Sequence, residues 1–219
     1  SPEIIEKKPK HLKFHIAEDD PEIIHKLVMA SYINPVASFE INMDKEMDFT
    51  SLLNQRRLIS LESVEIDKRQ ITSSGTITVS DPEPLLKTMA KKIKNMIIVM
   101  NKNYDKGLIE RYEDEIDKIK MLIDKFVIGS LTLGKTTKSK NIDLYYISSI
   151  SKELERIVDR LICLDESDKK FFDEIIKPIE ILQNILEDTS KLDQKYAMEF
   201  AKYMEAPSSV AEAVIKKSA

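Results

Sequence analysis

The sequence is poor in several residue types that carry much of protein chemistry. Its 219 residues include one cysteine, four glycines, three histidines and no tryptophan. Because Cys163 has no partner within the chain, the fold cannot depend on an intrachain disulfide, and we expect Cys163 to be a small buried apolar residue in a reducing compartment. The histidines, His11, His15 and His25, all lie near the start of the chain. Because no histidine follows His25, the remainder of the chain cannot contain the Glu-x-x-His di-iron motif of helical bundles.

Long apolar runs are also missing. No stretch approaches the roughly 18 apolar residues that a membrane-spanning helix needs, and no charged-then-apolar signal segment opens the chain. We therefore expect a cytoplasmic protein without a membrane span. The first residue is Ser1 rather than methionine. We also expect that the chain begins partway through a longer product or has been trimmed.

Charged residues, by contrast, are abundant. They make up 33% of the chain, and the net charge is −4. With so few glycines, this composition is typical of a mostly helical protein. A net negative chain has no overall electrostatic footprint for a nucleic-acid backbone, so we expect no nucleic-acid binding through this chain alone. Its length suits one large or two small domains with an ample core.

Residues 1–80 have the pattern of a small α+β domain. Apolar residues alternate with polar ones in four short segments, which is typical of half-buried strands. The expected order of elements is β-α-β-α-β-β, and the domain shows no catalytic spacing of residues. The predicted elements are strands at 12–17, 36–43, 61–66 and 71–79, a helix at 21–33 and a short helix at 48–58.

The start of the helix at 21–33 is signalled clearly. Asp20 offers an oxygen that can cap the helix, and Pro21 suits the first helical position. Asn34-Pro35 ends the helix, because the residue before a proline is disfavoured in helical conformation. The apolar residues expected on its buried side are Ile23, Ile24, Leu27 and Val28.

Residues 81–205 have the periodicity of helices packed in an antiparallel bundle, and a tail follows at 206–219. The first helix, at 81–104, repeats its apolar residues at helical spacing. Gly107 breaks or bends the chain before a second helix that ends at about Leu131. Further helices are predicted at 147–166 and 168–203, and the last resembles the first, so we expect a partial second repeat. The buried face predicted for the first helix comprises Leu86, Met89, Ile93, Met96, Ile97 and Met100.

Two of these helices carry a pair of carboxylates four residues apart: Glu113 with Asp117, and Glu155 with Asp159. In each helix the first carboxylate follows an apolar stripe residue by one position, so both pairs lie on the same shoulder of the apolar face. Like charges at this spacing cost about a few tenths of a kcal/mol unless a cation or basic partner offsets them. On facing helices the four carboxylates would suit a hard cation such as iron, manganese, calcium or magnesium.

The alternative that these carboxylate pairs have no role in metal binding stays open. In so acidic a helical protein such pairs also arise by chance, as Glu110 and Asp114 show. Arg156 and nearby lysines can neutralise the pairs without a metal. Tyr145 and Tyr146 are likewise predicted to be core aromatics, and contact with a partner is the alternative.

Two stretches of the bundle resemble the Glu/Asp-x-x-x-Asp signatures of the PhoU family of phosphate-uptake regulators. They are Glu113-Asp114-Glu115-Ile116-Asp117 and Leu154-Glu155-Arg156-Ile157-Val158-Asp159. The second is similar to the family's Leu-Glu-Arg-Ile-x-Asp. The order of segments also resembles archaeal members, which place an α+β segment before the bundle. The resemblance covers about residues 12–205.

The resemblance implies a regulator of phosphate uptake and phosphate signalling that is not an enzyme. Such a protein would bind the phosphate transporter's ATPase or a regulatory protein through its bundle, with or without a bound metal. We expect a homodimer, because the incomplete second repeat has an apolar side that needs a cover. Two alternatives stay open: a transcription regulator that lacks its DNA-binding domain, and a carboxylate-metal hydrolase or oxidase.

Overall fold

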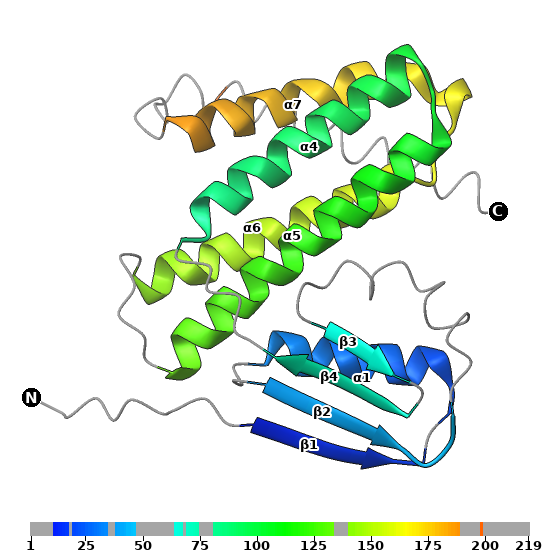
Figure 1. Cartoon of the computed structure of the whole chain (residues 1–219). Coiled ribbons are helices and arrows are strands. Elements are labelled where there is room, and N and C mark those ends of the chain that lie inside the picture. The colour runs from blue at the N-terminus through cyan, green and yellow to red at the C-terminus, as the bar shows by residue number, and fades with distance from the viewer. Residues whose placement is uncertain are drawn as a thin grey trace, which may run out of the picture. The chain divides into compact units, whose positions relative to one another are not determined.

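The computed structural model describes residues 11–17, 19–34, 38–46, 64–67, 69–74, 81–133, 140–188 and 198 (Figure 1). The chain is mixed α+β and mostly helical. It divides into two compact units. The first unit comprises Ser1–Pro82 with Met121–Ser148, and the second comprises Glu83–Lys120 with Ser149–Ala219. A segment from the middle of the predicted bundle therefore belongs to the first unit.

The first unit contains a four-stranded sheet with the order β1-β2-β4-β3. Strand β1 pairs with β2 in parallel, which requires a crossover, and helix α1 supplies it. Strands β2 and β3 each pair with β4 in antiparallel fashion. Each of the four predicted strands is confirmed in its described part, whereas the strand residues predicted at 36–37, 61–63 and 75–79 and the helix predicted at 48–58 lie outside the described residues. The elements are β1 (His11–Ile16), α1 (Pro21–Ile33), β2 (Ser38–Met43), β3 (Val64–Asp67) and β4 (Gln70–Ser74).

Helix α1 begins and ends as predicted. The backbone N–H of Glu22 donates to the Asp20 carboxylate at 2.8 Å, and this bond caps the helix start. Its buried residues are Ile24, Val28, Ser31 and Tyr32. The expectation for Ile23 is wrong, since this side chain is 47% exposed. At about 100° per residue, Ile23 lies beyond the edge of the face that Ile24, Val28 and Tyr32 define.

The core of the first unit lies between one face of the sheet and α1. Strand β2 buries every second residue, as a strand with one covered face should. Helix α5 (Lys106–Leu133) adds Met121 to this core. The Lys125 ammonium lies 3.9 Å from the centroid of the Tyr32 ring, and burial lowers the pKa of Lys125. The buried apolar residues of the sheet and α1 are Ile24, Val28, Tyr32, Phe39, Ile41, Met43 and Ile71.

The second unit is built from helices. They are α4 (Glu83–Lys102), the first part of α5, the last part of α6 (Asn141–Leu161), the short 3-10 helix η1 (Glu166–Asp168) and α7 (Lys169–Glu187). All six residues predicted for the buried face of α4 are buried. The predicted break near Gly107 is also confirmed, because α4 ends at Lys102 and the N–H of Leu108 donates to Asp105 at 3.0 Å where α5 starts.

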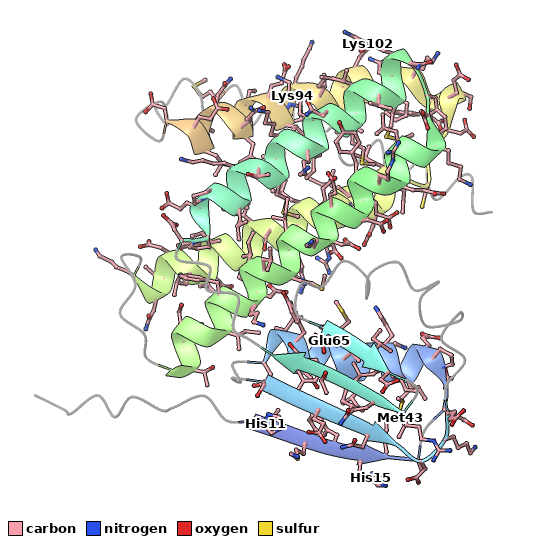
Figure 2. The ribbon with its side chains drawn as sticks, viewed as in Figure 1. His11, His15, Met43, Glu65, Lys94 and Lys102 are labelled. Atoms are coloured by element: carbon pink, nitrogen blue, oxygen red, sulfur yellow. The ribbon has the colours of Figure 1, made fainter. Side chains whose placement is uncertain are left out.

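Helices α4 and α7 pack side by side within the second unit (Figure 1). The Asn101 amide donates to the Asp173 carboxylate at 2.6 Å, and Lys94 forms a 3.0 Å ion pair with Glu180. Figure 2 shows Lys94 on α4. Helix α7 buries Phe172, Ile175 and Ile179, which recur at helical spacing. Apolar burial and polar pairs thus both fix α4 against α7.

Cys163 differs from its prediction. It is exposed, because α6 ends at Leu161 and Cys163 lies in the turn that follows. The next residue, Leu164, is the one that points into the core, and its carbonyl accepts a hydrogen bond from the Tyr104 hydroxyl at 3.2 Å. None of the described helices combines the length and the apolar character that crossing a membrane requires.

Candidate functional site

The four predicted carboxylates have unequal environments. On α5, Asp117 is only 6% exposed, with both carboxylate oxygens buried, and Glu113 is half-buried. On α6, Glu155 is half-buried and Asp159 is exposed. The shoulder of an apolar stripe therefore faces the interior in one helix and solvent in the other. The burial of these carboxylates depends on which neighbouring element packs against them, and the periodicity of the sequence does not identify that neighbour.

A metal centre needs several donor atoms within about 2.0–2.6 Å of one point. Within the described ranges of the chain, no three side chains of histidine, cysteine, aspartate or glutamate are grouped so that they could hold a metal ion. The structure therefore does not assemble the predicted carboxylates into a centre in the arrangement it describes. The metal site stays a prediction from the sequence.

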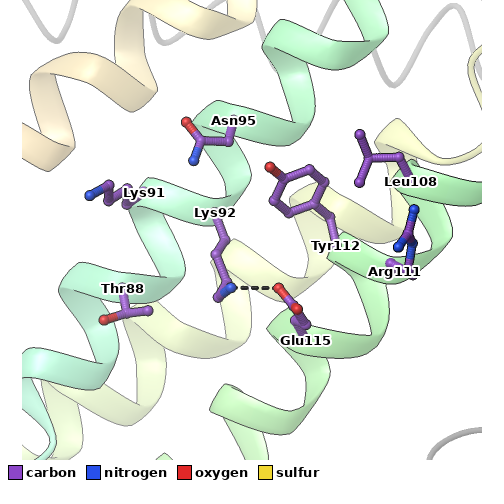
Figure 3. A pocket seen from close by; sticks show the side chains of 8 residues that line it. All are labelled: Thr88, Lys91, Lys92, Asn95, Leu108, Arg111, Tyr112 and Glu115. Carbon is purple, nitrogen blue, oxygen red and sulfur yellow. Dashed lines mark hydrogen bonds and ion pairs between the residues drawn. The ribbon is translucent and has the colours of Figure 1, made fainter. Parts of the chain in front are cut away.

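A groove of about 410 Å³ lies between α4 and α5 in the second unit. We call it the α4–α5 groove. Each helix contributes four residues, and in both helices they are spaced three, one and three positions apart, so they share one face of their helix. The lining residues are Thr88, Lys91, Lys92 and Asn95 from α4, and Leu108, Arg111, Tyr112 and Glu115 from α5 (Figure 3).

An ion pair crosses the α4–α5 groove. The Lys92 ammonium donates to the Glu115 carboxylate at 2.5 Å, which joins α4 to α5 (Figure 3). The Lys92 side chain is 29% exposed and that of Glu115 is 55% exposed. Because water screens a pair this exposed, its contribution to stability is at most about 1 kcal/mol. The pair is therefore weak enough for another anion to exchange with Glu115.

The other two cations of the groove have no carboxylate partner among the described residues. Arg111 donates its Nε proton to the carbonyl of Gly107 at 3.4 Å, and both Arg111 and Lys91 are exposed. The lining thus holds three cations and one carboxylate, Glu115. This surplus of positive charge in the lining favours an anion over a cation.

Two neutral side chains add further hydrogen-bond capacity to the groove. Asn95 and Tyr112 are both half-buried. In Figure 3 the hydroxyl of Tyr112 points toward α4, where Asn95 and Lys92 lie. Sequence reasoning did not identify this site. The available signal was the polar side chains at helical spacing on α4 and α5, the two helices that the break after Lys102 separates.

A second surface feature lies at the start of α6. Ile142, Tyr145 and Tyr146 are 53%, 62% and 56% exposed, and the two tyrosine rings meet edge to face with centroids 5.8 Å apart. We call these three residues the tyrosine surface. The prediction that the tyrosines are core aromatics is wrong, because Leu144 and Ile147 occupy the buried side of this part of the helix.

Comparisons of the chain with protein-family models, with curated proteins and with solved structures found no match in any of the three. We therefore base the function on the tyrosine surface and on the resemblance of the two acidic stretches.

Proposed function

We propose that this chain is a PhoU-like regulator of phosphate uptake and phosphate signalling that acts by binding a protein and catalyses no reaction. Its partner would be the cytoplasmic ATPase of the phosphate transporter or a regulatory protein. The helices α4, α5, α6 and α7 would form the antiparallel bundle of that family, with α7 beginning the partial second repeat. The tyrosine surface is the observation that supports binding of a protein, and the phosphate system is what the resemblance of the two acidic stretches implies.

The tyrosine surface has the chemistry of a protein-binding site. Large apolar side chains grouped on one helical face lose contact with water when a partner covers them, and each Å² of apolar area buried stabilises by about 25 cal/mol. Tyrosine is enriched among the residues that dominate binding energy, because its ring is large and rigid and its hydroxyl can form a hydrogen bond. Ile142, Tyr145 and Tyr146 recur at helical spacing, so one partner can cover all three.

The proposal is tested by direct binding of the purified transporter ATPase to the immobilised chain. We expect saturable binding by the wild-type chain and at least about tenfold weaker binding after the double change Tyr145→Ser and Tyr146→Ser, since central aromatic residues contribute about 2 kcal/mol or more. Ile23→Ser is the matched control, because Ile23 is also an exposed apolar residue, at 47%, but lies on α1.

Two results would contradict the proposal. One is a wild-type chain that binds neither the ATPase nor the regulatory protein of the phosphate system. The other is equal loss of binding in the control variant, which would mean that any exposed apolar residue acts nonspecifically. The same proposal includes a homodimer, which light scattering can test. A monomer at high protein concentration would rule out the homodimer.

A further inference from the structure

We propose that the α4–α5 groove binds a small anion with two linked phosphoryl groups, for which inorganic pyrophosphate is the simplest example. This inference goes beyond the proposed function and does not depend on the identity of the protein partner. It rests on three observations: the surplus of cations in the groove, the donors and acceptors of its lining, and the number of cations together with the volume of the groove.

The first observation is charge. Lys91, Lys92 and Arg111 line the groove against the single carboxylate of Glu115. Lys91 and Arg111 form no ion pair with any described residue, so an incoming anion meets two uncompensated cations. Ammonium and guanidinium groups form their strongest hydrogen bonds with anionic oxygens, and guanidinium can donate two parallel bonds to one phosphoryl group.

The second observation is the balance of donors and acceptors. The Lys91 ammonium and the Arg111 guanidinium are donors only, and the Asn95 amide and Tyr112 hydroxyl can also donate. The one carboxylate of the lining already accepts from Lys92. A ligand that satisfies these groups must present many acceptor oxygens and few donors. Phosphoryl groups do so, each with three oxygens.

The third observation is the number of cations and the volume of the groove. Three cations line it, Lys91 and Lys92 from α4 and Arg111 from α5 (Figure 3). Two linked phosphoryl groups carry more negative charge and more acceptor oxygens than a single phosphate ion, so they can pair with more of the three cations at once. The volume of about 410 Å³ also lies within the usual range of small-ligand sites. The groove therefore favours a diphosphate over a single phosphate ion.

Glu115 has a particular role in this arrangement. In the free protein its carboxylate binds Lys92, in the place that a ligand oxygen would take. A phosphoryl group must displace Glu115 and then lies beside its negative charge. Glu115 therefore weakens binding, and its removal should strengthen it, in contrast to removal of a lysine or arginine of the groove.

Isothermal titration calorimetry with pyrophosphate at low ionic strength tests the proposal. We expect saturable 1:1 binding by the wild-type chain, about tenfold tighter than that of orthophosphate and of sulfate. Lys92→Gln and Arg111→Gln should each weaken binding about 3- to 10-fold, and Glu115→Gln should strengthen it about 3-fold, in line with exposed charge-assisted bonds. Circular dichroism of each variant verifies that it is folded.

Lys94→Gln is the matched control. Lys94 and Lys92 lie on the same helix, have side chains that are each 29% exposed, and each form one ion pair, but Lys94 pairs with Glu180 of α7 and does not line the groove. We expect its affinity for pyrophosphate to equal that of the wild type. Lack of saturable binding in both the wild type and Glu115→Gln would overturn the proposal. An equal loss in Lys94→Gln and Lys92→Gln, or equal binding of sulfate and pyrophosphate, would also overturn it.

Discussion

Phe172→Ala is expected to lower the free energy of unfolding of the second unit by about 3–5 kcal/mol. Phe172 is 0% exposed and shares the buried face of α7 with Ile175 and Ile179, and α7 packs along α4. A buried phenylalanine removes at least about 150 Å² from water, which at about 25 cal/mol per Å² corresponds to about 4 kcal/mol. The cavity left by the missing ring adds to this cost.

The adjacent residue supplies the control. Phe171 is only half-buried on the same helix, so Phe171→Ala should cost about 1–2 kcal/mol, as expected for partial burial. Both values can be measured by urea denaturation followed by circular dichroism, with linear extrapolation to water. A loss below about 1 kcal/mol for Phe172→Ala, or a loss for Phe171→Ala that equals it, would refute the packing described for α7.

Three further predictions follow from other parts of the chain. Asp20→Ala should cost about 0.5–2 kcal/mol in urea denaturation, because the N–H of Glu22 loses its capping acceptor. Burial lowers the pKa of Lys125 below 10.5, so its folded form releases a proton that the unfolded chain still holds. The free energy of unfolding of the wild type should therefore rise relative to that of Lys125→Met as the pH increases toward 10.5. The same pH dependence of unfolding in the wild type and in Lys125→Met would contradict this. If the four predicted carboxylates do not form a metal centre, millimolar Mn²⁺ or Ca²⁺ should change the melting temperature by less than about 1 °C. A larger rise in melting temperature that is lost in Asp117→Asn would establish the metal site.

Elements governed by local rules could be predicted from the sequence. The start of α1 follows from Asp20 and Pro21, because capping and proline geometry act within one helical turn. The buried face of α4 follows from a single apolar stripe, since one helical face is covered along its whole length. The strands followed from alternation for the same reason, as one face of each meets the core.

Features that depend on which neighbour covers a face could not be predicted. Ile23 and Tyr145 lie one position from buried residues of their own helices, and only the packing partner decides which side of the stripe is exposed. Asp117 and Asp159 have matching sequence positions but opposite burial for the same reason. The α4–α5 groove needs the approach of two helices, and the sequence shows only that each has a polar face.

Amide hydrogen exchange of residues 141–148, with and without the phosphate transporter's ATPase, tests the central proposal most directly. These residues include the tyrosine surface, so we predict slower exchange there when the ATPase is bound and no change in β1–β4. Binding of the ATPase that leaves exchange at 141–148 unchanged would contradict docking through this surface.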